Sequence, residues 1–414
     1  MRVRIHRGTK EIGGTLVELE AAGQRLLIDC GLPLDAQTGD DSVMPPVEGF
    51  TSPSASLLGV VLSHGHRDHW GLLARAHAGL RVYLGEGTER ILNASGFFIR
   101  DVPPIQAAAY LREGQPLSLG PFTVTPHLVD HSAFDAYALT VEALGARLFY
   151  SGDLRSHGRK GALFERLVNH PPHNIDVMLM EGSSLGRLDE GALFPSENEI
   201  EAELAERIRA TAGMVLVVAS AQNIDRVVSI YRAAKRNGRS LVVDLYAAEI
   251  LHATGRGSIP QTAWDDVALF TPYHQRRKVK ASGRFDLIER HKNGRVFAEQ
   301  LVLHPERYVM LFRGSLLDDV IRAECLQGAH AIWSQWAGYL KDQPARDLMA
   351  KLAAHGIGFD VIHTSGHASI PDLKRLAAAV APRSLVPIHT FEADRFPSLF
   401  QNVVVRHDGE WWEV

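Results

Sequence analysis

Short apolar runs separated by turns rich in glycine and proline recur through the first 180 or so residues of the chain. The clearest of these runs are Arg25–Ile28, Gly59–Leu62, Arg81–Leu84 and Arg147–Tyr150. Their length is typical of β-strands, and their regular separation by turns predicts a β-sandwich. Several of the runs lead straight into polar residues, so we expect the strand ends to carry the chemistry.

The pattern changes between about residues 182 and 362. Helical spacing of apolar residues marks Glu197–Ala210 and Asn223–Arg236, and buried-type strands are indicated at Val215–Ala219 and Leu241–Asp244. A strand, a helix and a second strand in this order predict parallel strands joined by a crossover. We therefore expect a second domain of the α/β class.

The last segment returns to strand-like runs. Val403–Arg406 and Glu410–Val414 flank Asp408-Gly409, a dipeptide typical of a hairpin turn. We expect the C-terminus to complete the first domain, with the α/β block inserted into it. The predicted boundaries are residues 1–182 and 361–414 for the first domain and 183–360 for the insert.

Composition narrows the class of protein. A chain of 414 residues with 45% hydrophobic residues favours two domains. Its two cysteines, Cys30 and Cys325, lie far apart and indicate a reducing, cytoplasmic compartment. We expect no signal peptide and no membrane span. A net charge of −4 excludes an overall basic nucleic-acid binder but leaves room for a local basic groove.

The segment His64-Gly65-His66-Arg67-Asp68-His69 carries four side chains that can bind a metal, and it directly follows an apolar strand. His64 and His66 point to the same side of extended backbone and can hold one cation together. Asp68 and His69 follow at a turn, where they can hold a second cation nearby. Imidazole and carboxylate suit Zn²⁺ and related ions. A histidine-rich surface loop is the alternative, but the complete pattern after a strand favours a metal site.

Three further segments extend this pattern. They are Leu26–Gly31 with Asp29, Val129–Ser132 with His131, and Leu148–Asp153 with Asp153. An aspartate after a strand is more often a turn residue, but the order and spacing of the whole set resemble the metallo-β-lactamase superfamily. The resemblance implies that Asp29 orients the ligand loop by hydrogen bonds, that His131 is a further ligand, and that Asp153 bridges two metals.

Motifs around the insert resemble the β-CASP branch of that superfamily, whose members cut nucleic acids. They are Leu179–Ser184 with Glu181, Ser220–Arg226, Ser365-Gly366-His367, and Pro387-Ile388-His389. The ribonuclease J group is similar in having a His-x-Ser-Gly-His element before Pro-x-His. A histidine at position 389 favours RNA over DNA within this branch. The implied fold is α/β, a metallo-β-lactamase αββα sandwich with an inserted α/β β-CASP domain. We expect the extra C-terminal domain of bacterial ribonuclease J to be absent, which leaves a homo-oligomer open.

The resemblance implies a zinc-dependent nuclease that hydrolyses single-stranded RNA, as an exo- or endonuclease, with a hydroxide activated by two metal ions. Two Zn²⁺ ions per chain are expected, with Mn²⁺ as an alternative. The implied metal ligands are His64, His66 and His131 for one ion, Asp68, His69 and His389 for the other, and Asp153 between them. The implied catalytic residues are Asp68, Asp29, His367 as general acid, and Glu181, which orients His367 and raises its pKa. The candidate substrate contacts are His363, Ser365, Gly366 and Ser369.

Two basic segments leave alternatives open. Tyr273–Lys280 continues through Arg284, Arg290, Lys292 and Arg295, opposed only by Asp286 and Glu289. It either lines an RNA channel, with Tyr273 or Phe285 for base stacking, or is a solvated helix face. Leu154–Lys160 either meets substrate phosphates or is a solvated loop.

The alternative functions are a DNA nuclease of the same branch, a small-molecule metallohydrolase, and a non-catalytic RNA-binding scaffold.

Overall fold

The computed structural model describes residues 1–36 and 40–414, which divide into two compact units. The first unit comprises Met1–Phe194 and Gly366–Val414, and the second comprises Pro195–Ser365. The predicted boundaries, after residues 182 and 360, lie earlier than these. Leu185 still packs in the core of the first unit, while residues 358–361 form a strand of the second unit's sheet, so both junctions move towards the C-terminus.

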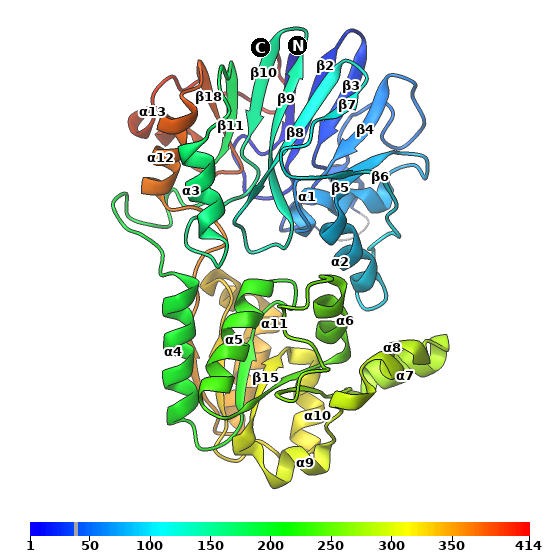
Figure 1. The fold of residues 1–414 in the computed structure, drawn as a ribbon, viewed down its shortest axis with the longest axis vertical. Helices are drawn as coiled ribbons and strands as arrows, with labels where there is room; N and C mark the ends of the chain where they lie inside the picture. Colours follow the sequence, from blue (N-terminus) through cyan, green and yellow to red (C-terminus); the bar gives the residue numbers. More distant parts are fainter. Residues whose placement is uncertain (37–39) are drawn as a thin grey trace. The chain divides into compact units, whose positions relative to one another are not determined.

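The first unit contains two β-sheets that lie face to face (Figure 1). One sheet has the order β19-β1-β2-β3-β4-β5-β6, with bounds Trp411–Glu413, Arg2–Arg7, Leu16–Ala21, Gln24–Ile28, Leu57–Val61, Val82–Gly85 and Ala107–Leu111. The other has the order β18-β11-β10-β9-β8-β7, with bounds Ser384–Ile388, Val177–Glu181, Ala146–Tyr150, Ala136–Ala143, Phe122–Val129 and Leu117–Leu119. All four strands predicted for this part of the chain are present as β3, β4, β5 and β10.

Alternation along the strands builds the central core of the first unit. In β1, Val3 and Ile5 are fully buried, while the arginines beside them are not. Because successive side chains of a strand point to opposite faces, this period of two turns one face of the sheet inwards. The buried face meets residues such as Leu139 and Leu148 from the other sheet.

Helices cover the outer faces of both sheets (Figure 1). Against the first sheet lie α1 (Arg67–Trp70), a 3-10 helix at Gly71–Arg75 and α2 (Glu86–Gly96). Against the second lie α3 (Gly161–Asn169), α12 (Ile370–Val380) and α13 (Phe396–Leu399). Each outer layer has its own apolar core, so the unit is the αββα sandwich predicted from the sequence.

The hairpin predicted around Asp408-Gly409 is wrong. Trp411–Glu413 pairs with β1 in the first sheet, with Val3 opposite Trp412. Val403 instead makes a single parallel bridge to Leu385, in β18 of the second sheet. The turn is real, since Gly409 has a φ of 82°, but it carries the chain from one sheet to the other.

The second unit is built on one parallel sheet. Its order is β14-β13-β15-β12-β16-β17, with bounds Val267–Leu269, Ser240–Val243, Tyr308–Phe312, Val215–Val218, His330–Trp333 and Gly358–Val361. Its helices are α4 (Glu197–Ala210), α5 (Ile224–Arg236), α6 (Leu245–Ala253), α7 (Tyr273–Ser282), α8 (Phe285–Arg290), α9 (Ala298–Leu303), α10 (Leu317–Arg322) and α11 (Gln343–Ala354).

The predicted helices of this unit are confirmed, and so is the parallel direction of its strands. A capping box of Ser196 and Glu199 starts α4, and the side chain of Asn223 caps α5. However, β12 and β13 are not neighbours, because β15 lies between them and pairs with both. A crossover fixes the direction of two strands, not their adjacency.

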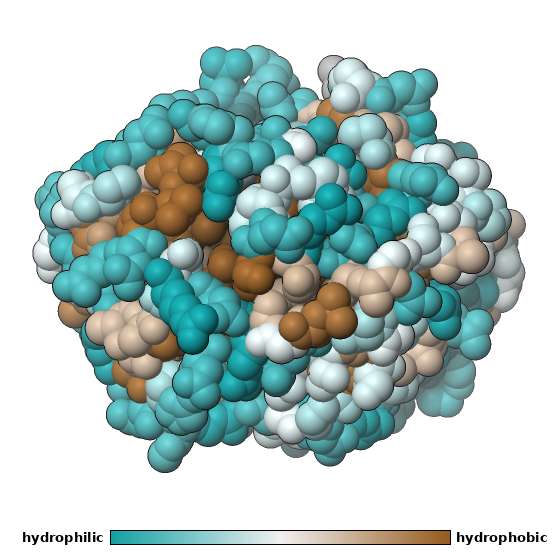
Figure 2. Space-filling model, turned by 90° about the horizontal axis from the view of Figure 1, so that it is seen from above, coloured by the Kyte–Doolittle hydropathy of each residue, from teal (hydrophilic) through white to brown (hydrophobic). Residues whose placement is uncertain are grey.

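Figure 2 shows one face on which hydrophilic residues surround several separate apolar patches. Within residues 1–36 and 40–414, no helix combines the length and the low polarity that crossing a membrane requires.

Candidate metal centre

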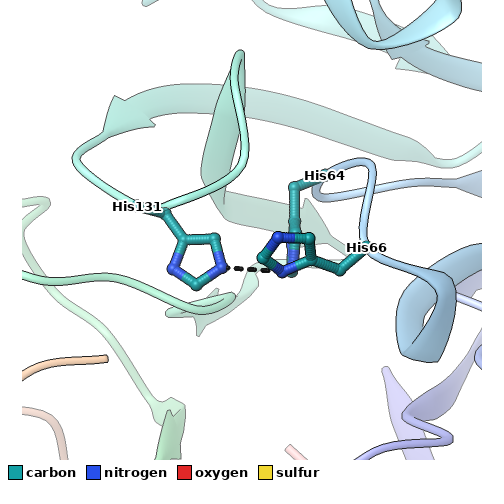
Figure 3. Close-up of side chains that lie close together, drawn as sticks. All are labelled: His64, His66 and His131. Carbon is teal, nitrogen blue, oxygen red and sulfur yellow. Dashed lines mark hydrogen bonds between the residues drawn. The ribbon is translucent and has the colours of Figure 1, made fainter. Parts of the chain in front are cut away.

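Three histidines from two strand ends form the first group. His64 and His66 follow β4, and His131 follows β8. One ring nitrogen from each lies within 4.8 Å of the others. Figure 3 shows the rings converging, with Nε2 of His131 3.0 Å from Nδ1 of His66. These are the three histidines that the sequence assigned to one cation.

A second group lies beside the first. Asp68 and His69 come from α1, Asp153 follows β10, and His389 follows β18. Their ligand atoms also lie within 4.8 Å of one another. Oδ2 of Asp153 is 3.1 Å from Nε2 of His69 and 3.7 Å from Nε2 of His64. The Asp153 carboxylate therefore approaches both groups, as a bridging ligand must.

Sharp turns at the strand ends bring these residues together. Asp29 follows β3 and His389 follows β18, and both have left-handed backbone, with φ of 58° and 54°. Such angles are uncommon outside glycine and bend the chain out of the strand direction. Gly31 then passes so close to the ligand loop that a Cβ atom would lie 1.7 Å from the carbonyl oxygen of Asp68.

Asp29 ties the ligand residues to the scaffold. Its Oδ1 accepts a hydrogen bond from the backbone N–H of Ser63 at 2.7 Å. Its Oδ2 accepts from the hydroxyls of Ser63 and Tyr150, and from Nδ1–H of His69 at 2.7 Å. A buried carboxylate with four donors fixes the orientation of the His69 ring and leaves Nε2 facing the group.

Other ligand rings are held in the same way. Nδ1–H of His131 donates to the carbonyl oxygen of Gly366 at 2.6 Å. Nδ1 of His64 lies 3.0 Å from the hydroxyl of Ser63, and Nδ1 of His389 lies 2.8 Å from the hydroxyl of Thr15. In each of these three rings, Nδ1 has a hydrogen-bond partner outside the ligand group. Nε2, on the other side of the ring, therefore faces the group.

The inward-facing atoms fit a metal. Among the described residues, Nε2 of His64 and Nε2 of His389 are buried and have no hydrogen-bond partner. An unsatisfied buried polar atom costs about 1–3 kcal/mol, so two of them in one place call for a missing partner. A set of imidazoles and carboxylates is the donor chemistry that Zn²⁺ and similar divalent ions take. The residues therefore fit such ions.

The protonation of the first group also suits a cation. Burial lowers the pKa of His64 and His131 well below the usual value, and lowers that of His66 to about 4. These three rings are neutral at pH 7 and offer lone pairs. Burial acts in the same direction on His69, but three nearby carboxylates outweigh it and raise the pKa well above the usual value. A cation must displace that proton.

Beside the two groups lies an acid-base pair. Nδ1 of His367 is 3.2 Å from Oε2 of Glu181 and 3.9 Å from Oδ2 of Asp153. Glu181 is buried and accepts backbone hydrogen bonds from Leu154 and Ser183. Burial lowers the pKa of His367, but the charges of Glu181 and Asp153 outweigh it and raise the pKa to about 9. The ring is cationic at neutral pH, and its side chain is 23% exposed.

Residues 24–211 match the sequence profile of the beta-lactamase superfamily domain. The matched segment covers less than half of the chain and is similar to metallo-β-lactamase domains. The crystal structure of a protein of unknown function from Enterococcus faecalis V583 has a similar fold, with a TM-score of 0.80, 20% identity and 99% coverage of both chains. We refer to residues 1–194 and 366–414 as the metallo-β-lactamase unit. The resemblance inferred from the motifs is confirmed for this unit.

Curated relatives extend over most of the chain. Ribonuclease J of Mycobacterium tuberculosis strain H37Rv is 26% identical over 419 residues, which cover 94% of this chain and 68% of the relative. Ribonuclease J of Helicobacter pylori strain 26695 is 21% identical, with 92% of this chain and 55% of the relative covered. The chain thus spans only part of the length of these relatives.

The four predicted substrate contacts have different surroundings. Gly366 belongs to the metallo-β-lactamase unit and has no room for a side chain, since a Cβ atom would lie 2.6 Å from the hydroxyl of Ser132. His363 and Ser365 belong to the second unit, where Nδ1 of His363 accepts from Arg226 at 3.3 Å. Ser369 is fully buried and caps α12, so its prediction as a substrate contact is wrong.

Arg155 belongs to the basic segment Leu154–Lys160, for which the sequence offered two interpretations. The sequence left open whether its basic segment meets substrate phosphates. The Arg155 side chain is fully buried and forms an ion pair with Asp130 at 3.3 Å. Nζ of Lys160 in the same segment donates to the carbonyl oxygens of His131 and Ala133. These two cations hold the turn that carries His131 in the metallo-β-lactamase unit.

Three residues that support the ligands escaped the sequence analysis. Ser63 directly precedes the His64–His69 segment, and Tyr150 lies within the Leu148–Asp153 motif. A hydroxyl group so close to the candidate ligands could have indicated a supporting role for both residues. Thr15 had no comparable signal, because it is 374 residues from His389, its partner. Only the folded metallo-β-lactamase unit brings these two residues together.

Proposed function

We propose that this protein is a metal-dependent phosphodiesterase that hydrolyses single-stranded RNA. The observation that carries the proposal is the pair of ligand groups that meet at Asp153, next to the His367–Glu181 pair. The relatives named ribonuclease J, which match over 92–94% of this chain, support RNA as the substrate class. We also propose residues 195–365 as a β-CASP domain.

The metal ligands would divide into two sets. His64, His66 and His131 would hold one divalent cation, zinc or manganese, and Asp68, His69 and His389 a second, with Asp153 between them. When bound, two such ions supply positive charge to the phosphoryl oxygens and lower the pKa of coordinated water. Asp29 keeps the His69 ring in place, so it acts through that ligand rather than on the substrate.

The chain's own acid is His367. With a pKa of about 9, its imidazolium holds a proton at neutral pH. It can give that proton to the oxygen that leaves the phosphorus when the phosphodiester breaks. Glu181 stabilises the charged ring and fixes its direction. Ser365, His363 and the backbone at Gly366 are proposed to bind the substrate phosphate.

The proposal is tested by incubating the purified protein with end-labelled single-stranded RNA and DNA of the same sequence. We expect shortened RNA products, and their pattern tells stepwise removal of nucleotides from internal cutting. Asp68→Ala should reduce the rate by about 100-fold or more, since even residues behind metal ligands commonly contribute 10- to 100-fold. Asp394→Ala is the matched control, because that carboxylate is 77% exposed and pairs with Lys10, which is not one of the candidate ligands.

Two results would contradict the proposal. If Asp68→Ala cleaves RNA as fast as the Asp394→Ala control, the ligand set is not the active site. If DNA is degraded and RNA is not, the proposed substrate class is wrong, whereas the proposed hydrolysis of a phosphodiester is retained. Metal analysis of the purified protein adds an independent measurement, and two divalent ions per chain are expected.

A further inference from the structure

The second unit has a pocket that shares no residue with the metal centre. Its volume is about 340 Å³. It lies between the start of α7, the segment that leads into α9, and the end of α10. The lining residues that matter here are Tyr273, Arg276, Arg295, Phe297, Asp319 and Arg322. The volume is at the small end of the range for ligand sites, so the pocket has room for one planar group rather than a folded partner.

Two aromatic rings line this pocket, and both remain half-exposed. Tyr273 and Phe297 are each 49% exposed. The guanidinium of Arg295 lies 4.9 Å from the centre of the Phe297 ring, and that of Arg322 lies 5.7 Å from the centre of the Tyr273 ring. Exposed rings at a hollow, each next to a guanidinium, are the components of a stacking platform for a nucleobase.

The charges at the pocket favour an anionic polymer. Within the described part of the chain, no ion pair is formed by Arg276 or Arg295. Arg322 is partly neutralised by Asp319 at 3.5 Å. Asp319 also accepts from the backbone N–H of Tyr273 at 3.0 Å, which fixes the aromatic residue at the rim. Positions 273–295 hold eight basic and two acidic residues in a chain whose net charge is −4. The pocket lining itself sets Arg276, Arg295 and Arg322 against Glu299 and Asp319, an excess of one positive charge.

We infer that this pocket is an accessory site for one nucleotide of a single-stranded RNA, outside the metal centre. The base stacks on Tyr273 or Phe297, and the adjoining phosphates contact Arg276 and Arg295. The inference rests on the proposed function for the identity of the polymer. A merely solvated helix face explains the charges, but it does not explain two half-exposed aromatic rings that share one hollow.

An accessory site has a length-dependent effect. A strand that reaches both the metal centre and the pocket gains affinity from the second contact without a change in the chemical step. A strand too short to reach both occupies only one site at a time. Loss of the pocket should therefore weaken binding of long RNA and leave the cleavage of a very short RNA unchanged.

Binding is measured by fluorescence anisotropy with a labelled 20-nucleotide RNA whose phosphorothioate backbone resists cleavage. For the double variant Tyr273→Ala, Phe297→Ala we expect a Kd about tenfold higher or more, because stacking on an aromatic side chain contributes about 1–3 kcal/mol per base. For Arg276→Gln, Arg295→Gln we expect a shallower dependence of log K on log salt, by about 0.7 per lost phosphate contact. Hydrolysis of an unmodified four-nucleotide RNA should stay at the wild-type rate in both variants.

Matched controls come from the same unit. Arg256→Gln removes an exposed arginine, and Tyr339→Ala removes an aromatic residue that is 41% exposed. Neither lines the pocket, so both should bind the 20-nucleotide RNA as the wild type does. Equal thermal unfolding of all variants shows that they are folded.

Crosslinking gives a second measurement on the unaltered protein. RNA that carries 4-thiouridine should crosslink to peptides containing Tyr273 or Phe297. Unchanged Kd and salt dependence in the pocket variants, or crosslinks that avoid both peptides, would overturn the inference while RNA cleavage still stands. If the wild type neither binds nor cleaves RNA, the proposed function itself fails, and the two failures are distinguished.

Discussion

At the scale of single residues, the histidines that could hold a metal differ in protonation from the histidine that holds a proton. His64 and His131 are neutral because they are buried, whereas His367 is cationic because Glu181 and Asp153 lie beside it. Similar imidazole rings therefore take opposite roles within one site, and the neighbouring charges decide which.

The first prediction concerns His367. His367→Ala should lower kcat for RNA by about 10²- to 10⁴-fold, the usual contribution of a general acid, because the leaving oxygen loses its proton donor. The metal content should remain that of the wild type, since His367 is outside both ligand groups. His407→Ala, an exposed histidine in the same unit, is the control. Unchanged RNA hydrolysis by His367→Ala would remove it from the mechanism.

The pH dependence of the reaction follows from the same pair. A general acid with a pKa of about 9 remains protonated up to that pH, so its loss of the proton lowers activity on the alkaline side. Glu181→Gln keeps the shape of the side chain but removes the charge that raises this pKa. The alkaline limb of kcat against pH should therefore move to lower pH. If the alkaline limb of Glu181→Gln stays at the wild-type pH, a group other than His367 determines the alkaline loss of activity.

Glu18 gives a prediction about stability rather than activity. Burial raises its pKa, but bonds from His6, Arg4 and Arg25 outweigh this effect and hold the pKa at about 2, below the ordinary 4.5. Its contribution to folding is therefore present above pH 4.5 and lost as the pH falls towards 2. The shift corresponds to about 3 kcal/mol at most.

Urea unfolding at several pH values tests the Glu18 network. Glu18→Gln should be less stable than the wild type at pH 7, and the difference should shrink as the pH falls below 4.5. Glu20 lies on the same strand as Glu18 and forms an exposed ion pair with Arg2 of the neighbouring strand. Glu20→Gln should therefore change stability little. A deficit in Glu18→Gln that is the same at every pH would show that charge is not its cause.

The candidate ligands could be predicted from the local sequence, because each lies in a short motif that comes after an apolar strand. The contacts that orient them could not. The carbonyl of Gly366 is 235 residues from His131, and nothing in the local sequence of either residue indicates the other. Ser369 was misjudged for a related reason, since a serine beside a motif can equally be a helix cap.

At the scale of elements, local signals predicted the helices and strands, while their partners depended on distant parts of the chain. Capping residues mark the starts of α4 and α5. In contrast, β19 pairs with β1, and β15 lies between β12 and β13. Apolar runs identify strands because a buried strand shows its burial in its own residues. Which strands pair depends on segments that are distant in the sequence.

The turn after β3 provides a prediction at this scale. Gly31→Ala should force the Asp68 loop to move, since the new Cβ atom would lie 1.7 Å from the Asp68 carbonyl oxygen. We expect reduced metal content and a lower Tm. Gly191→Ala is the control, because no atom lies within 4 Å of its added Cβ. A Gly31→Ala variant that keeps wild-type metal content and Tm would show that the turn does not position Asp68.

At the scale of the whole molecule, all seven candidate ligands belong to the metallo-β-lactamase unit. Removing the metal with a chelator should lower the Tm, and adding Zn²⁺ or Mn²⁺ back should restore it. At a free metal concentration of 100 times Kd, the expected stabilisation is about 2.7 kcal/mol. Calorimetry with and without the chelator measures this, and an unchanged Tm would mean that the ligand groups hold no ion.

The second unit interrupts the first, and this has a consequence for how the enzyme is made. His389 and the strand Trp411–Glu413 are synthesised only after the whole of residues 195–365. A nascent or prematurely released chain that ends before residue 389 lacks one ligand of the second group. The order of translation thus delays assembly of the complete ligand set until His389 has been made, after the whole of the second unit.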